Sequence, residues 1–228
     1  MKRVLIFSAL VAIAFASCKK KVSQVSTIVT ASYPTITIST PQFISIPVGG
    51  ALPDANAIVA TAYDSFYHES LGVVVDASKL SNLNAGLYTV TISAKNKYGY
   101  IGYENVYVAV TDVHDTVDVS GLYYRDEDPK RPAFVTKVAR GLFHTTNLGG
   151  VDTTGQPATI LHGYFAVLDN TTIDLGMQSI PGSTFTAANV ITGTYGALDL
   201  VSIPKSYSYA FSDQMGLFGT GIRSFYKQ

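Results

Sequence analysis

Hydrophobic and polar residues alternate along much of the chain from Pro34 onward. Residues 35–39 and 43–46 alternate with a period of two, and the turn-forming pair Gly49 and Gly50 follows them. This alternation predicts half-buried strands, because successive side chains of a strand point to opposite faces of the sheet. Further strands are predicted at residues 57–62, 71–75, 86–94 and 102–110. Short strands without intervening helical patterns favour an antiparallel sandwich or barrel, so the predicted fold class is all-β.

The second half of the chain carries a recurring glycine that is followed two residues later by an aromatic residue. The copies are Gly121-Leu-Tyr123, Gly141-Leu-Phe143, Gly163-Tyr-Phe165, Gly193-Thr-Tyr195 and Gly216-Leu-Phe218. A glycine bend that begins a strand whose second residue faces the core would produce this spacing. The distance between copies is irregular, which argues against a solenoid or a propeller. We therefore predict a second all-β unit of meandering strands, either a sandwich or a barrel.

The N-terminus has the organisation of a secretory signal. Lys2 and Arg3 form a basic start, residues 4–15 are apolar, and small residues precede Cys18. The apolar stretch is too short to cross a hydrocarbon core of about 30 Å as a helix. Residues 1–17 are therefore predicted to be a cleaved signal peptide.

The segment Phe15-Ala-Ser-Cys18 resembles the lipobox of bacterial lipoproteins, although Phe15 stands where that family usually has Leu. The resemblance implies that Cys18 is lipidated and that the chain is held on a membrane through this lipid anchor. It implies a location in the cell envelope, as an outer membrane lipoprotein. Residues 19–21 are lysines where surface-exported lipoproteins often carry acidic residues, so the periplasmic and the surface-facing side both stay open. The alternative is a free or buried cysteine behind an ordinary signal peptide.

Cys18 is the only cysteine of the chain. If it carries lipid, no thiol remains for a disulfide, a zinc site or a cysteine nucleophile. Residues 18–32 are then the lipidated cysteine and a tether, although residues 22–33 could also pair as a first strand.

Four segments follow one another in a fixed order between residues 33 and 111. They are Pro34-Thr-Ile-Thr-Ile, Ile46-Pro-Val-Gly49, Gly86-Leu-Tyr88-Thr-Val-Thr and Val106-Tyr-Val-Ala-Val110. In this order they resemble bacterial immunoglobulin-like domains. The resemblance implies a β-sandwich at residues 33–111 that acts as a spacer or an interaction module and carries no common catalytic residues.

The polar residues 112–119 interrupt the strand pattern, and we predict a linker there, followed by a C-terminal β domain at residues 120–228. This architecture, with the segment Gly121-Leu-Tyr-Tyr-Arg125, is similar to two-domain lipoproteins of uncharacterised families that are encoded beside glycan-uptake systems in gut-type Gram-negative bacteria. The resemblance implies a role in polysaccharide utilisation.

Charge and motif content exclude several classes of function. The chain has 16 basic and 16 acidic residues and a net charge of zero, which argues against nucleic acid as a partner. Its four histidines occur singly, without the spacing of metal ligands, so neither a metal nor a cofactor is predicted. No serine nucleophile motif is present, and we predict that the chain is not an enzyme. Whether two carboxylates stand at a glycosidase spacing is left open.

A dense charged segment follows two tyrosines and gives the first candidate ligand site. We select Tyr123, Tyr124, Arg125 and Asp126, because a guanidinium and a carboxylate can hydrogen-bond sugar hydroxyls beside a tyrosine ring. The alternative is a solvated hairpin loop.

Three aromatic residues within five positions give the second candidate site. Tyr63, Phe66 and Tyr67 lie in a predicted loop, where their rings could stack on sugars or contact a protein partner. The alternative is ordinary burial, since tyrosine is a good strand former.

These observations favour one function and leave a second open. The first hypothesis is a non-catalytic, lipid-anchored accessory protein of the envelope that binds a polysaccharide or oligosaccharide through its C-terminal domain. The alternative is a structural or adhesin-like lipoprotein whose partner is another envelope protein, and a hydrolase comes third.

Overall fold

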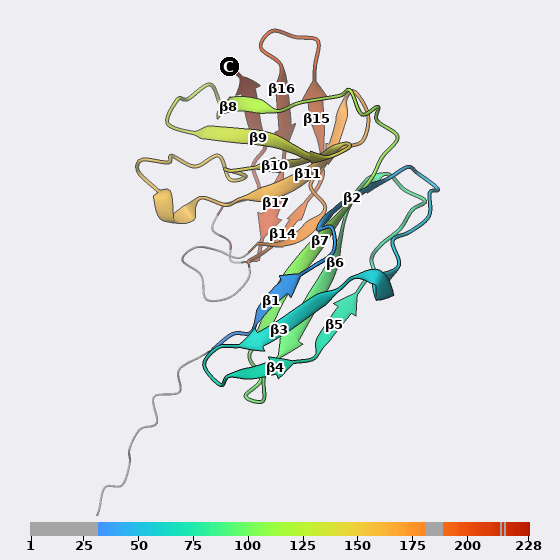
Figure 1. Ribbon diagram of the computed structural model, residues 1–228. Coiled ribbons are helices and arrows are strands. Elements are labelled where there is room, and N and C mark those ends of the chain that lie inside the picture. Colours follow the sequence, from blue (N-terminus) through green and yellow to red (C-terminus); the bar gives the residue numbers. More distant parts are fainter. Residues whose placement is uncertain (1–31, 181–188, 215, 217) are drawn as a thin grey trace, which may run out of the picture. The chain divides into compact units, whose positions relative to one another are not determined.

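The computed structural model describes residues 32–180, 189–214, 216 and 218–228. The described residues fold into strands joined by turns and two short 3-10 segments, so the predicted all-β class is confirmed (Figure 1). No helix in these residues has the length and apolar character needed to span a membrane. The predicted signal peptide and nearly all of the predicted tether, Cys18 included, lie outside the described residues.

The N-terminal half forms two packed sheets. One contains β1 (Thr35–Ile38), β3 (Ala60–Asp64) and β4 (Glu69–Leu71), in that order. The other has the order β2 (Phe43–Ile46), β7 (Ile101–Val110), β6 (Gly86–Lys95) and β5 (Val73–Asp76). All neighbours are antiparallel except β2 and β7, which run parallel.

Strand alternation builds the core between these two sheets. In β6, Val90 and Ile92 are buried and pack in one cluster with Ile36 of the opposite sheet. The intervening Thr89 and Thr91 are half-buried on the other face of β6. The sequence pattern Thr-Val-Thr-Ile therefore becomes one apolar face and one hydroxyl face, as a period of two requires.

Two predicted strands differ from those in the structure. The strand predicted at residues 57–62 begins only at Ala60, because Asp54 accepts a hydrogen bond from the backbone N–H of Asn56 and caps the 3-10 segment η1 (Ala55–Ala57). The strand predicted at residues 71–75 is divided at Gly72. There the chain passes from β4, which pairs with β3, to β5, which pairs with β6.

The C-terminal half contains a closed antiparallel barrel, which decides between the predicted sandwich and barrel. Its first strands are β8 (Gly121–Arg125), β9 (Pro132–Ala139), β10 (Leu142–Thr145), β11 (Gly163–Val167) and β12 (Thr172–Asp174). It is completed by β15 (Tyr195–Asp199), β16 (Ser206–Tyr209) and β18 (Arg223–Lys227). A separate sheet contains β13 (Met177–Ile180), β14 (Asn189–Gly193) and β17 (Phe211–Asp213), while η2 (Pro157–Thr159) precedes β11.

Aromatic side chains fill the barrel interior. The rings of Tyr207 and Phe225 stack with centroids 4.9 Å apart, and Tyr123 meets Tyr207 edge-on at 4.8 Å. Phe143 and Phe165 are also fully buried in this core. A barrel of eight strands has an interior that side chains can fill, and here bulky rings occupy it.

The predicted inward position of the aromatic residue after each glycine is confirmed for Tyr123, Phe143 and Phe165. It is wrong for Tyr195, which is 64% exposed. The chain leaves β14 at Gly193 and enters a different sheet at Tyr195, so the inward–outward alternation restarts across Thr194.

The sandwich and the barrel meet over a packed junction, and residues 32–228 form one compact unit. The Asp174 carboxylate accepts a hydrogen bond of 2.8 Å from the backbone N–H of Leu87, and the Thr111 hydroxyl donates to the carbonyl of Val167 at 2.8 Å. Within the predicted linker 112–119, Val113 and Val119 are buried in the barrel core. The segment is therefore anchored at both ends, and the predicted domain boundaries themselves stay a prediction.

Candidate functional site

The first predicted cluster divides between the barrel core and its surface. Tyr123 is only 1% exposed, and its hydroxyl donates to the carbonyl of Val119 at 2.8 Å. Burial raises the pKa of Tyr123 to about 12. Its ring packs inside the barrel, whereas the next residue, Tyr124, is half-buried.

Arg125 and Asp126 make most of their polar contacts within the protein. The Arg125 guanidinium donates to the carbonyls of Gly149 and Gly150 at 3.1 and 3.3 Å, and its Nε lies 3.2 Å from the Asp126 carboxylate. Arg131 approaches the same carboxylate at 3.5 Å. These contacts hold the hairpin between β8 and β9, and exposed ion pairs of this kind contribute at most about 1 kcal/mol.

The second predicted cluster forms an aromatic surface at one end of the sandwich. Phe66 and Tyr67 meet edge-on with centroids 4.8 Å apart, and Tyr67 stacks on Tyr98 at 4.6 Å. The Lys97 ammonium lies 4.8 Å from the centroid of Tyr67. We call Phe66, Tyr67, Lys97 and Tyr98 the aromatic tip. Tyr63 lies apart from these rings, 44% exposed on β3 opposite Thr35.

Asp64 organises the two loops that carry the tip. Its carboxylate accepts hydrogen bonds from the backbone N–H groups of Phe66 and Tyr67 and from the side chains of Asn96 and Ser32. Burial by itself would raise the pKa of Asp64, but these four hydrogen bonds together outweigh it and hold the pKa below its usual value. One buried carboxylate thus joins the β3–β4 loop, the β6–β7 loop and residue 32.

Sequence reasoning found half of the tip. Phe66 and Tyr67 were visible as a local cluster of aromatics, whereas Lys97 and Tyr98 come from a hairpin about thirty residues later. The sequence feature that could have indicated Lys97 and Tyr98 is the turn segment Asn96-Lys-Tyr-Gly99, which lies between two long predicted strands. Its pairing with the β3–β4 loop depends on how the two sheets pack.

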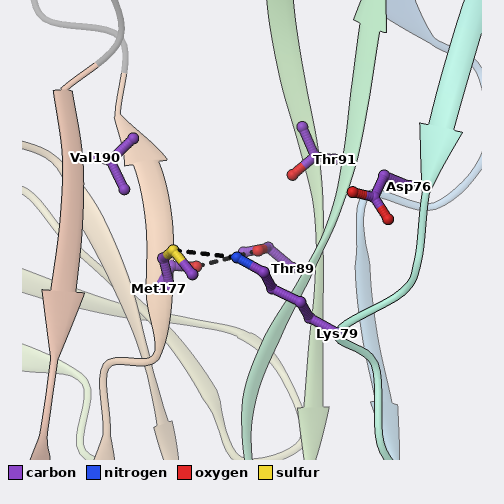
Figure 2. A pocket seen from close by; sticks show the side chains of 6 residues that line it. All are labelled: Asp76, Lys79, Thr89, Thr91, Met177 and Val190. Carbon is purple, nitrogen blue, oxygen red and sulfur yellow. Dashed lines mark hydrogen bonds between the residues drawn. The ribbon is translucent and has the colours of Figure 1, made fainter.

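A small groove lies between the sandwich and the sheet that contains β13 and β14, and Figure 2 shows it from close by. It has a volume of about 200 Å³ and is lined by Asp76, Lys79, Thr89, Thr91, Met177 and Val190. We call this set the groove. The Lys79 ammonium lies 3.5 Å from the Met177 sulfur, and the Thr89 hydroxyl donates to the Met177 carbonyl at 3.1 Å. Sequence reasoning missed the groove, because its walls come from segments about one hundred residues apart.

The groove continues into a second, more open hollow that shares Val190. This hollow has a volume of about 370 Å³ and is lined by Val190, Thr192, Ser212, Asp213 and Gln214. In the groove, the hydroxyl and N–H of Ser78 hold the pKa of the Asp76 carboxyl below its usual value. A carboxylate, an ammonium group and two hydroxyls therefore surround one small space, with Met177 and Val190 as its apolar wall.

Two histidines that looked isolated in the sequence lie together, His144 on β10 and His162 just before β11. The rings of His144 and His162 are 5.5 Å apart, and Tyr164 lies 5.2 Å from His144. Partial burial, and then the neighbouring His162, lower the pKa of His144. Within the part of the chain that the structure describes, no three His, Cys, Asp or Glu residues are grouped so as to hold a metal ion.

Comparison with known proteins gives little further guidance. No family model matches the chain, and no curated protein matches it. Among solved structures, the chain is similar to a crystal structure of a lipoprotein from Bacteroides thetaiotaomicron, with 15% identity and a TM-score of 0.36. That match covers 86% of this chain and 100% of the other.

Proposed function

We propose that the chain is a lipid-anchored protein of the bacterial cell envelope that binds a saccharide in the groove without transforming it. The lipobox-like segment ending in Cys18 supports the anchor. The observation that carries the binding proposal is the set of polar groups that surrounds the groove. The barrel is an unsuitable alternative, because aromatic rings fill its interior.

The polar groups of the groove match the chemistry of a sugar. Asp76 offers acceptor oxygens to neighbouring hydroxyls and Lys79 offers donors. The hydroxyls of Thr89 and Thr91 donate to the Met177 carbonyl and the Asn105 side chain, so they offer lone pairs as further acceptors. Met177 and Val190 offer an apolar surface to the C–H face of a ring. Sites of this kind use a few placed polar groups for orientation and apolar contacts for affinity.

The size of the groove limits what it can hold. Its volume of about 200 Å³ is below the range of roughly 300–1,000 Å³ that is usual for drug-sized ligands. It therefore suits one ring of a longer chain, and the adjoining hollow offers room for a second ring along β14. We propose that the ligand is an oligosaccharide or polysaccharide that is bound through one or two of its residues.

The proposal of binding without catalysis rests on the carboxylates. Glycoside hydrolysis needs two carboxyl groups across the scissile bond. The described lining of the groove contains one, Asp76, and the carboxylate of the adjoining hollow, Asp213, accepts a hydrogen bond from the backbone N–H of Phe218. Incubation of the mature chain with each bound glycan should leave the glycan intact in product analysis. Release of shorter fragments would replace the proposal with a hydrolase.

Glycan arrays followed by calorimetry on the mature chain test the site. We expect Asp76→Ala and Lys79→Ala each to weaken binding about tenfold, equal to about 1.4 kcal/mol. Asp126→Ala is the matched control, because it removes an exposed carboxylate from the first candidate site of the sequence analysis, in the β8–β9 hairpin. Loss of binding in Asp126→Ala alone would return the site to the β8–β9 hairpin. Capture of an envelope protein without any saccharide dependence would favour the adhesin-like alternative.

A further inference from the structure

We propose that the aromatic tip contacts the membrane surface beside the lipid anchor, so that the chain rests on the bilayer through Phe66, Tyr67, Lys97 and Tyr98. This inference depends on the lipid anchor proposed above and is independent of the groove. It assigns a lipid surface as the partner of the tip.

The length of the chain limits how far the tip can lie from the anchor. Ser32 is fixed at the tip, because its hydroxyl donates to the Asp64 carboxylate at 2.8 Å and its carbonyl accepts from the Asn96 amide at 2.9 Å. Fourteen residue steps separate Cys18 from Ser32. Even a fully extended chain of that length spans at most about 50 Å. A lipid on Cys18 therefore keeps the tip within about 50 Å of the bilayer.

The chemistry of the tip suits a membrane interface. Phe66 and Tyr98 are 53% and 55% exposed, and Lys97 lies over the rings of Tyr67 and Tyr98. Aromatic rings with polar edges gather at the headgroup level of membranes, and lysine stems extend beside them so that the ammonium reaches water or phosphate. The two loops, residues 65–68 and 96–100, contain one lysine and no carboxylate. Lys95, which is also exposed, adds a second cation next to them.

The long strands separate the tip from the rest of the unit. Strands β6 and β7 pair along ten residues from Gly86–Val110 to Lys95–Ile101. Near the start of β6, Leu87 is hydrogen-bonded to Asp174 of the barrel, and the tip lies beyond Lys95 at the other end of this strand (Figure 1). Eight residues of strand correspond to roughly 27 Å, so contact between the tip and a membrane leaves the barrel free. Thr89 and Thr91 of the groove lie between these two ends.

A saccharide platform is the rival use of the same rings. The membrane is favoured because residue 32, which continues the chain from Cys18, is hydrogen-bonded to Asp64 and Asn96 of the two hairpins that carry the tip.

The chain has no tryptophan, so one substitution creates a unique fluorescent reporter. Phe66→Trp places it in the tip, and Phe134→Trp on β9 is a matched control, because the two phenylalanines are 53% and 55% exposed. Both variants are lipidated in cells and reconstituted in anionic vesicles that contain brominated lipids. We expect blue-shifted and quenched emission from the Phe66→Trp variant only, and reduced quenching when Lys97→Glu is added to it. Equal emission and quenching in the Phe66→Trp and Phe134→Trp variants would overturn the proposal.

Two further measurements separate this inference from the proposed anchor. Fatty-acid labelling and vesicle flotation of wild type and Cys18→Ser test the anchor alone. A labelled Phe66→Trp protein that floats with vesicles but shows no quenching would overturn the membrane contact and leave the anchor intact. Absence of label on wild type would overturn both. A shift of the Phe66→Trp emission by soluble oligosaccharide, without any effect of lipid, would assign the tip to saccharide instead.

Discussion

Two fully buried tyrosines of the barrel differ in the hydrogen bonding of their hydroxyls. Tyr209 donates to the carbonyl of Leu148 at 2.8 Å, whereas the Tyr207 hydroxyl has only the Thr145 hydroxyl beside it and makes no well-formed hydrogen bond among the described residues. Tyr209→Phe leaves a buried carbonyl without a donor and should lower the free energy of unfolding by about 1–3 kcal/mol. Tyr207→Phe removes a buried polar group and should leave that free energy unchanged or raise it. Urea unfolding of the two variants measures the difference, and an equal loss in both would contradict this account.

Strand register explains why Tyr123 is buried although the sequence suggested it as a ligand-binding residue. A tyrosine at the start of a strand can face either side, and only the register with neighbouring strands decides which. In the barrel, Tyr123 lies opposite Ala133, and both side chains point into the core. The polar tip of a buried tyrosine needs an acceptor, and here the carbonyl of Val119 supplies it.

At the scale of elements, the partial burial of His144 on β10 makes the stability of the fold depend on pH. Because the pKa of His144 is lowered, the unfolded chain takes up a proton on this residue at a higher pH than the folded chain does. Stability should therefore decrease as the pH falls from about 7 through the ordinary histidine pKa of about 6.5.

Substitution of each histidine tests this dependence. His144→Gln should reduce the loss of stability between pH 7.5 and pH 5.5, as measured by urea unfolding. His162→Gln removes the neighbouring charge and should raise the pKa of His144 in an NMR titration, because His162 contributes to its lowering. The same decrease of stability with pH in wild type and His144→Gln would contradict the assignment.

Strands were predicted well where apolar and polar residues alternate along one continuous segment. The hairpin of β6 and β7 was predicted within one residue at each end, because apolar residues alternate with Thr, Ser or Tyr at residues 89–94 and 106–108. The crossing at Gly72 was missed, since an apolar run reads the same whether its strand stays in one sheet or changes sheets. Closure of the barrel was also undecided, because pairing of β8 with β18 joins residues about one hundred positions apart.

At the scale of the whole unit, the candidate sites depend on contacts that no local pattern encodes. The groove joins β5 and β6 to β13 and β14, and the tip joins two hairpins through Asp64. The groove exists only because the sandwich packs against the C-terminal half, whereas the tip exists because the two sheets of the sandwich pack together. Leu87, Tyr107 and Ala109 form one buried cluster with Leu142 and Ala166 of the barrel. The junction thus fixes β6 against the C-terminal half, and Thr89 and Thr91 of the groove lie on this same strand.

Gly176 allows this junction to close. Its φ is +56°, and a Cβ there would lie 2.2 Å from the carbonyl oxygen of Leu87 on β6. Gly49 is the matched control, because its φ is +74° and a Cβ would meet nothing within 4 Å. Gly49→Ala should cost only the strain of a left-handed residue, about 1–2 kcal/mol. Gly176→Ala adds a clash with the backbone of β6, so that residue 176 and β6 must move apart.

We expect wild type and Gly49→Ala to unfold in one transition, and Gly176→Ala to lose cooperativity between the sandwich and the barrel. Hydrogen exchange read by mass spectrometry measures this, because peptides from β6–β7 and from β16–β18 report on the two parts separately. In Gly176→Ala, the N–H of Leu87 should exchange faster, since its bond to Asp174 is the buried hydrogen bond next to the clash. Saccharide binding in the groove should weaken in the same variant, because Met177 follows residue 176 directly. Equal exchange and equal binding in the two alanine variants would show that the junction does not control the groove.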